Sequence, residues 1–151
     1  GQSIYLREIL GREDGPPPPV DLDHERRVGD FVRGLIRERL VTAVHDLSDG
    51  GLAVALAEMA MASGIGASVN QLNDVSGVAT FFGEDQGRYL VTARRDHLDE
   101  LHDRADAAGI FMPWIGTTGG SDLKLGEARA ISVAKLKQAH ENWFPAYMGG
   151  G

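Results

Sequence analysis

The chain has 151 residues, and its 22 acidic residues against 15 lysines and arginines give a net charge of −7. This length is typical of one domain, and 42% hydrophobic with 25% charged residues excludes global disorder. The acidic balance excludes a duplex nucleic-acid binder, which needs a basic face against the phosphates. Cysteine is absent, which excludes disulfides, thiolate metal sites and cysteine nucleophiles.

No targeting or membrane segment is recognisable in the sequence. The longest strongly apolar stretch, residues 51–65, contains Glu58 and is shorter than the roughly 20 residues that span a bilayer. No basic region precedes an apolar one at the start, so no signal peptide is predicted. We therefore expect a cytoplasmic protein without a membrane partner. The absence of an initiator methionine before Gly1 suggests a fragment of a longer chain.

The first 19 residues are predicted to lie apart from the main domain. Residues 3–10 have the spacing of a short helix that stops at Gly11. The run GPPPP at residues 15–19 excludes helix and favours an extended polyproline spacer. We expect residues 1–19 to be the end of a preceding domain plus a linker, residues 20–148 to be the domain proper, and residues 149–151 to be a flexible tail.

A helix is predicted from residue 21 to residue 40, with Asp21 as its N-cap and acidic residues in its first turn. Its expected apolar face consists of Leu22, Val28, Phe31, Val32, Leu35, Ile36 and Leu40. Residues 41–47 favour a buried strand, residues 48–51 a turn, and residues 52–63 an alanine-rich helix that stops at the glycines 64 and 66.

The second half alternates strands and helices. The strand candidates are residues 67–72, 78–82, 88–93 and 111–116, with a hairpin formed by residues 122–125 and 130–133. Helices are expected at residues 96–108 and 136–144, the second ending at Pro145. The predicted fold class is therefore α/β (α+β), with a mixed β-sheet flanked by helices.

The sequence from His45 to Leu52 joins a strand to a helix through two glycines. A helix N-terminus has free N–H groups and partial positive charge, and glycines let a phosphate approach these amides. Asp46 and Asp49 could hold Mg²⁺ on that phosphate. The phosphate- or nucleotide-binding candidates are Asp46, Ser48, Asp49, Gly50 and Gly51. The alternative is that Ser48 or Asp49 caps the helix and the glycines only allow the turn.

A second polar loop lies between two apolar segments at residues 82–89. Its candidate substrate-side residues are Glu84, Asp85, Gln86 and Arg88. The alternative is a solvated turn with a local ion pair of Arg88, which contributes little to stability.

Other motifs are weaker. The glycine turn is no EF-hand, because Ala57 stands where a bidentate glutamate is required, and no Walker loop is present. The Ser-x-x-Lys spacings at Ser121 and Ser132 fall in predicted strands or turns, so we attribute them to chance. The histidines are scattered, and no metal site is predicted. Trp114, Trp143 and Phe144 are expected in a core or an interface.

Two motifs carry a family resemblance. The segment AVHDLSDGGLAVALAEM at residues 43–59 resembles the C-terminal domain of the phosphoribosylformylglycinamidine synthase family, in its synthetase subunit. The segment FGEDQGRYLV at residues 82–91 is similar to that family's Phe-Gly-Glu-Ser-Gln-x-Arg-Phe/Tyr motif, and GQSIYLRE at residues 1–8 resembles the end of the preceding domain. The chain departs from the pattern at Asp85 and Gly87.

The resemblance implies a role in purine biosynthesis within the AIR-synthase-related superfamily. That family uses ATP and Mg²⁺ to activate the formamide oxygen of formylglycinamide ribonucleotide, and ammonia released from glutamine by a partner subunit then displaces phosphate. Its synthetase chain contains two N-type and two C-type domains, and this sequence resembles the second C-type domain. The implied partners are the N-terminal domains of the same chain, the glutaminase and a small accessory subunit.

The same resemblance implies limits for this chain. The family's catalytic histidines and most of its ATP and Mg²⁺ residues lie in the N-type domains, so no catalytic residue and no certain cofactor is expected here. Residues Glu84, Asp85 and Gln86 would be the counterpart of a substrate-contacting motif in the first C-type domain, which leaves a working, auxiliary or degenerate site open. We expect the chain alone to be inactive. The competing hypothesis is a free-standing phosphate- or nucleotide-binding module without chemistry.

Overall fold

The computed structural model describes residues 3–70 and 77–149. Its elements belong to two compact units that alternate along the sequence. The first unit takes the chain up to residue 55 and residues 82–114, and the second takes residues 56–81 and the chain from residue 115. Local sequence patterns do not indicate this division, because two of its boundaries fall inside predicted or observed helices, at residues 51–63 and 77–82.

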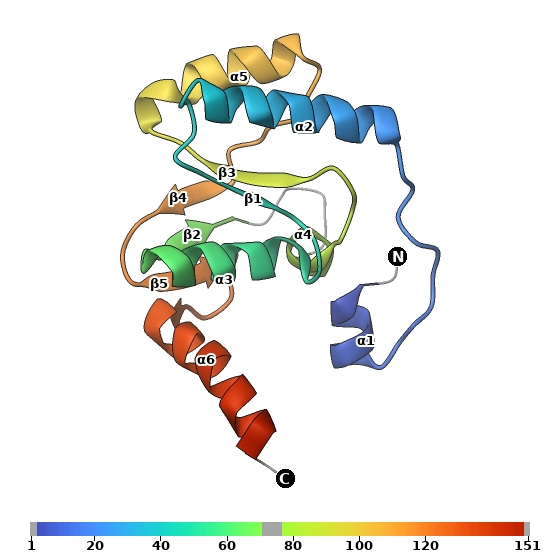
Figure 1. The fold of residues 1–151 in the computed structure, drawn as a ribbon, viewed down its shortest axis with the longest axis vertical. Coiled ribbons are helices and arrows are strands. Elements are labelled where there is room, and N and C mark those ends of the chain that lie inside the picture. Colours follow the sequence, from blue (N-terminus) through green and yellow to red (C-terminus); the bar gives the residue numbers. More distant parts are fainter. Residues whose placement is uncertain (1–2, 71–76, 150–151) are drawn as a thin grey trace. The chain divides into compact units, whose positions relative to one another are not determined.

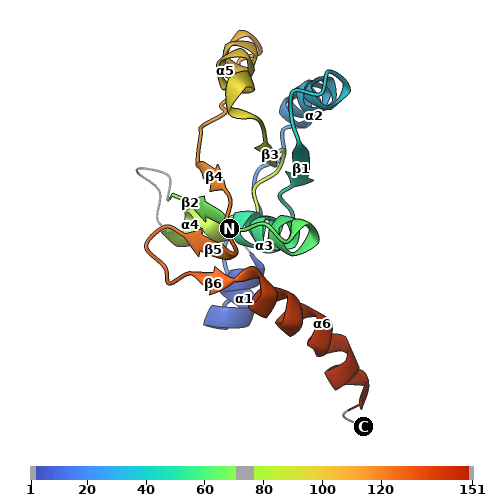
Figure 2. The same ribbon diagram turned by 90° about the vertical axis from the view of Figure 1, so that its left-hand side faces the viewer.

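The first unit is built on a two-stranded antiparallel ladder of β1 and β3. In this ladder Ala43 lies opposite Thr92, and Asp46 lies opposite Tyr89. In both ribbon views the helices α2 and α5 lie next to each other beside this ladder (Figures 1 and 2). The elements of the unit are α1 (Ile4–Leu10), α2 (Leu22–Arg37), β1 (Ala43–Asp46), β3 (Tyr89–Thr92), η1 (Arg95–His97) and α5 (Leu98–Ala107).

Helix α2 begins where the sequence predicts, because the Asp21 side chain accepts a hydrogen bond from the His24 amide. Its buried face is narrower than expected. Val28, Val32 and Leu35 are buried, whereas Leu22 is 72% exposed and Ile36 is 50% exposed, so the prediction was wrong for these two side chains.

The core of the first unit is a cluster around Leu35, Leu40 and Leu101, which come from α2, the loop after it and α5. The partly buried side chains packed against this cluster are Phe31, Val41, Ala93 and Met112. Removing a leucine side chain from water contributes about 1.5–3 kcal/mol. This cluster therefore fixes the two helices against the segments that carry β1 and β3.

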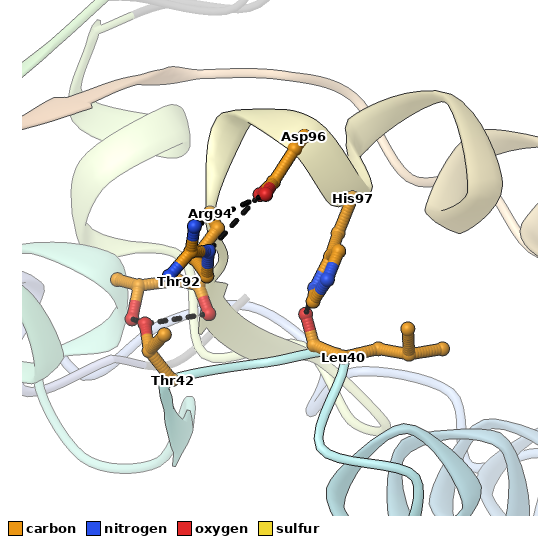
Figure 3. A network of polar contacts seen from close by, with 6 residues as sticks. All are labelled: Leu40, Thr42, Thr92, Arg94, Asp96 and His97. Atoms are coloured by element: carbon orange, nitrogen blue, oxygen red, sulfur yellow. Dashed lines mark hydrogen bonds and ion pairs between the residues drawn. The ribbon is translucent and has the colours of Figure 1, made fainter.

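Polar contacts join the segments at one end of the ladder (Figure 3). The Thr42 hydroxyl donates to the Thr92 carbonyl over 3.1 Å, and His97 Nδ1 donates to the Leu40 carbonyl over 3.1 Å. Arg94 donates through two nitrogens to the Asp96 carboxylate. His97 thus has a structural role in holding the start of α5 to the loop after α2.

The second unit contains a four-stranded sheet in the order β4-β2-β5-β6. Strands β2 and β5 are parallel and the other pairs are antiparallel, which confirms the predicted mixed sheet, although the chain forms two sheets. The elements are β2 (Ala67–Val69), β4 (Gly116–Thr118), β5 (Asp122–Leu125), β6 (Ile131–Ser132) and α6 (Val133–Gly149), and α3 (Gly51–Ser63) and α4 (Gly77–Phe82) each pass from one unit to the other.

Several expected elements differ in the structure. The strand predicted as buried at residues 41–47 is β1, whose two end residues are exposed and whose two middle residues are only partly buried. Residues 78–82, predicted as a strand, lie in helix α4, because a short apolar run does not distinguish the two. The strand predicted at residues 111–116 lies at residues 116–118 instead, paired with β2. Of the strand predicted at residues 67–72, residues 67–69 form β2, and residues 71 and 72 lie outside the described residues.

Helix α6 begins at residue 133, before the predicted residue 136, and continues through Pro145, where the sequence predicted its end. A proline removes one hydrogen bond and costs about 3 kcal/mol in a helix interior, but it does not forbid the helix. Figure 2 shows α6 extending away from the sheet of its own unit. Val133 is its buried residue. Trp143 and Phe144 are more than 60% exposed, as is Trp114 in the first unit, so none of these three side chains lies in a core. Among the described residues no helix combines the length and apolarity needed to cross a membrane.

Candidate functional site

The glycine turn lies between β1 and α3, as predicted. Gly50 and Gly51 have φ values of 78° and 62°, in the left-handed region that favours glycine. A Cβ on Gly51 would lie 2.6 Å from the Gly83 carbonyl oxygen, and a Cβ on Gly50 would lie 2.2 Å from Val54 Cγ2. Both glycines are buried. The turn therefore needs glycine for its own conformation and for close packing.

The amide of Gly50 has a partner inside the chain. It donates to Glu84 Oε1 over 2.8 Å, and the same oxygen accepts from the Ile4 amide over 2.9 Å. Glu84 is partly buried. Glu84, which was predicted to face the substrate, thus accepts a hydrogen bond from the Gly50 amide, which was predicted to bind phosphate.

The polar residues of the turn divide. The Ser48 hydroxyl donates to the Asp46 carboxylate, which lowers the pKa of Asp46. The ring nitrogen Nδ1 of His45 donates to the Asp46 carbonyl over 2.6 Å. Since α3 begins at Gly51, the residue directly before the helix is Gly50 rather than a polar cap. Asp49 is exposed.

Six of the nine candidate residues line two separate open cavities of the first unit, each of about 460 Å³, and Gly50, Gly51 and Asp85 line neither of them. Asp49 and Glu84 line one cavity, and Asp46 and Ser48 line the other with Gln86 and Arg88. The structure therefore does not bring Asp46 and Asp49 together on one ligand position. The further residues of the first cavity are Ser3, Ile4, Arg7, Arg12 and Glu13.

Arg88 ties the second loop to its surroundings. Its Nη1 donates to the Gly83 carbonyl over 3.2 Å and lies 3.6 Å from Asp85 Oδ2. Its backbone carbonyl accepts from the Leu47 amide over 2.9 Å, so the loop runs beside the start of the glycine turn. The predicted local ion pair is present, and Asp85 is exposed.

The second cavity also contains side chains that sequence reasoning missed. Most of them come from helix α2, which the sequence presented only as a packing element, and the others come from the segment after β1, the loop before β3 and the first residue of β3. The additional residues are Leu22, Glu25, Arg26, Gly29, Arg33, Leu47, Gly87 and Tyr89. The spacing of Glu25, Gly29 and Arg33 by four residues, with a glycine in the middle, is the signal that could have found this face. Glu25 Oε1 is buried, and the part of the chain that the structure describes offers it no hydrogen-bond partner.

Two other sequence features are explained locally. The Ser132 hydroxyl accepts from the Lys135 amide over 3.2 Å, so it caps the start of α6. Within residues 3–70 and 77–149, no three histidine, aspartate or glutamate side chains gather in a group that could hold a metal ion.

Comparison with known proteins identifies relatives. A family model described as "AIR synthase related protein, C-terminal domain" matches residues 1–126. The chain is 60% identical over 149 residues to "Phosphoribosylformylglycinamidine synthase subunit PurL" of Sinorhizobium fredii (strain HH103), with 99% of this chain and 20% of the relative covered. It is 64% identical over 156 residues to the protein of the same name from Chelativorans sp. (strain BNC1), with 100% of this chain and 21% of the relative covered. The chain thus spans about a fifth of the length of these relatives.

The fold is similar to that of a solved structure, Thermotoga maritima PurL complexed with FGAR. The TM-score is 0.71 at 17% sequence identity, covering 86% of this chain and 24% of that chain. The Thermotoga protein has also been solved with ATP and with ADP, and in a structure named PurLQS. This likeness confirms the α+β fold with its mixed sheet.

Proposed function

This chain belongs to the family of AIR synthase related protein C-terminal domains, and from this premise we propose that it is a C-terminal domain of phosphoribosylformylglycinamidine synthase. The longer protein would convert formylglycinamide ribonucleotide, ATP and glutamine-derived ammonia to formylglycinamidine ribonucleotide, as an ATP-dependent C–N ligase of purine biosynthesis. The observation that carries the proposal is the 60% identity over 99% of the chain to a PurL subunit. Its proposed location is the cytoplasm.

We propose that this domain supplies one wall of a ligand site. Asp46, Ser48, Gln86 and Arg88 already line one open cavity, and they are the groups we assign to the ligand side there. Asp49, Gly50, Gly51, Glu84 and Asp85 remain candidates in and beside the glycine turn. The proposed assembly includes the N-terminal domains of the same chain, a glutaminase and a small accessory subunit, with residues 1–19 leading in from the preceding domain.

We propose that this domain forms only part of a site for ATP and Mg²⁺. The described residues contain no cluster of three metal-ligating side chains, and the Gly50 amide already donates to Glu84. We therefore propose that other domains of the longer protein hold most of the nucleotide and its magnesium. No chemical step is assigned to residues of this chain.

A domain exchange tests the ligase role. The matching fifth of the Chelativorans PurL, which is 64% identical to this chain, is replaced by this sequence and produced in a purine-requiring strain that lacks its own PurL. We expect growth without added purine, and phosphate release by the purified chimera with formylglycinamide ribonucleotide, Mg-ATP and ammonia. The strain carrying the relative without that fifth is the control. A soluble chimera that assembles but forms no product contradicts the proposal.

The chain alone distinguishes a ligase domain from a free-standing binding module. We expect no amidine formation with ammonia as the nitrogen donor, since one domain cannot form both walls of an interdomain site. We also expect no saturable NMR shift at Gly50, Gly51 and Glu84 on titration with Mg-ADP. Saturable shifts at these amides would favour the binding module instead.

A further inference from the structure

The carboxylate of Glu84 joins two segments that lie 80 and 34 residues away from it in the sequence. Its Oε1 accepts from the Ile4 amide at the start of α1 and from the Gly50 amide in the glycine turn. We infer that Glu84 is an internal latch, which holds α1 on the glycine turn and keeps the Gly50 amide from any external anion. An anion reaches this amide only after the latch opens.

The latch is an efficient contact because both donors are backbone N–H groups at helix starts. Ile4 is the first residue of α1, and Gly50 directly precedes α3. Free N–H groups and partial positive charge concentrate at these positions. A carboxylate that accepts from such groups forms charge-assisted hydrogen bonds, which are about twice as strong as neutral ones.

A second contact supports the same fastening point. The ring of Tyr5 in α1 stacks on that of Phe82, with centroids 4.5 Å apart and planes inclined by 27°. Phe82 lies two residues before Glu84, so one short segment holds α1 through both a ring and a carboxylate. None of the seven residues of α1 is buried, and at its far end Ile9 is 66% exposed. Helix α1 is therefore fastened at its first turn and weakly held beyond it.

Solvent reaches the latch from one side. The open cavity of about 460 Å³ beside Glu84 is lined by both ends of the contact, Ile4 and Glu84, and by Arg7, Arg12 and Asp49. A small carboxylate can enter this space without unfolding of the glycine turn. The inference concerns the turn that the proposed function also uses, but it does not rest on the ligase role, because the latch is measured without nucleotide.

Amide hydrogen exchange on the 151-residue chain tests the latch. In Glu84→Ala we expect exchange at the Ile4 and Gly50 amides and at the following α1 amides to rise about tenfold or more, since a charged hydrogen bond is lost. Trypsin cleavage after Arg7 and Arg12 should accelerate as well. The control is Asp103→Ala, which removes an exposed carboxylate of α5 that lies outside both candidate loops. It should leave these amides unchanged.

Rescue separates a latch from general loosening. Excess formate should restore protection of the Gly50 amide in Glu84→Ala. It should leave α1 released, because formate, unlike the Glu84 side chain, is not covalently attached to the segment that holds α1. Exchange of the Leu101 amide in the core reports the global stability of each variant. If Glu84→Ala unfolds, Glu84→Gln is used instead, since it keeps a weaker, neutral hydrogen-bond acceptor. Unchanged exchange of the α1 amides in a folded variant overturns the inference, as does a failure of formate to protect Gly50.

Discussion

Helices α2 and α6 have 16 and 17 residues, and both carry large apolar side chains at helical spacing. In α2 this stripe is buried, since Leu35 packs with Leu101 of α5 and is only 2% exposed. In α6 Trp143 and Tyr147 stack on each other, 5.3 Å apart, while remaining at least 65% exposed. Apolar periodicity thus predicts that a helix forms, but burial depends on a partner surface that periodicity does not reveal.

The largest difference between the two helices should appear on truncation of Leu35. Leu35→Ala creates a cavity in the α2–α5 core and should lower the free energy of unfolding by about 2–5 kcal/mol. Urea denaturation followed by circular dichroism measures it. The control is the next residue, Ile36→Ala, which is half exposed and should cost less than about 1 kcal/mol. Equal losses in the two variants would show that Leu35 does not carry the core.

Glycines give the next largest effect. A Cβ on Gly66, at the start of β2, would lie 2.2 Å from the Asp122 carbonyl oxygen, so Gly66→Ala must separate two backbones and should cost about 1–3 kcal/mol. Gly34 in α2 has open space around its Cβ position. Gly34→Ala should therefore stabilise the helix by about 1 kcal/mol. Urea midpoints of both variants test the contrast, which fails if both shift in the same direction.

The caps of the two helices should differ in their pH dependence. The His24 amide lowers the pKa of Asp21 below its ordinary 3.8, so the ionised cap stabilises α2 above that value and its contribution is lost as the pH falls through the lower folded pKa. The urea midpoints of wild type and Asp21→Ala should differ at about pH 6 and converge as the pH falls below the ordinary 3.8 and through the lowered pKa of Asp21. Ser132 caps α6 through a hydroxyl, so the effect of Ser132→Ala should show no such convergence.

The smallest effect is expected in α6. Trp143→Ala removes a large ring that is 65% exposed and should change the free energy of unfolding by less than about 0.5 kcal/mol. Chemical denaturation of the chain measures this value. A loss close to that of Leu35→Ala would mean that the ring is buried in solution, and that α6 does not differ from α2 in the burial of its apolar side chains.

Much of the fold follows from local patterns. Asp21, the alanine-rich helix after the glycine turn and the hairpin of β5 and β6 are where their sequences predict them, because caps, spacing and turn residues act within a few positions. Residues 78–82 were wrong because helix and strand satisfy the same short apolar run. The predicted helix end at Pro145 was wrong because a helix tolerates one lost hydrogen bond. The division into two sheets depends on pairings between distant residues, which local patterns do not specify.

The candidate site, like the fold, was predictable in its local parts but not in how those parts come together. The glycine turn and the polar loop at residues 82–89 could be found from residue types alone. Their relation could not, because the two hydrogen bonds of Glu84 connect positions 34 and 80 residues apart. The α2 side of the second cavity was missed because the sequence presented this helix only as a packing element. Long-range placement, rather than residue chemistry, is what the sequence left undetermined.

The alternation of the two units along the chain has a consequence for ribosomal synthesis. The parallel pairing of β2 with β5 joins Ala67 to Leu123, and residues 82–114 of the other unit are made between them. The first unit can complete its ladder as soon as β3 has left the ribosome, whereas β2 must wait for the whole of that stretch. Nascent β2 therefore waits for its partners β4 and β5 until that stretch has been made, and a pause in translation over residues 82–114 would lengthen the exposure of its unpaired strand edges to aggregation.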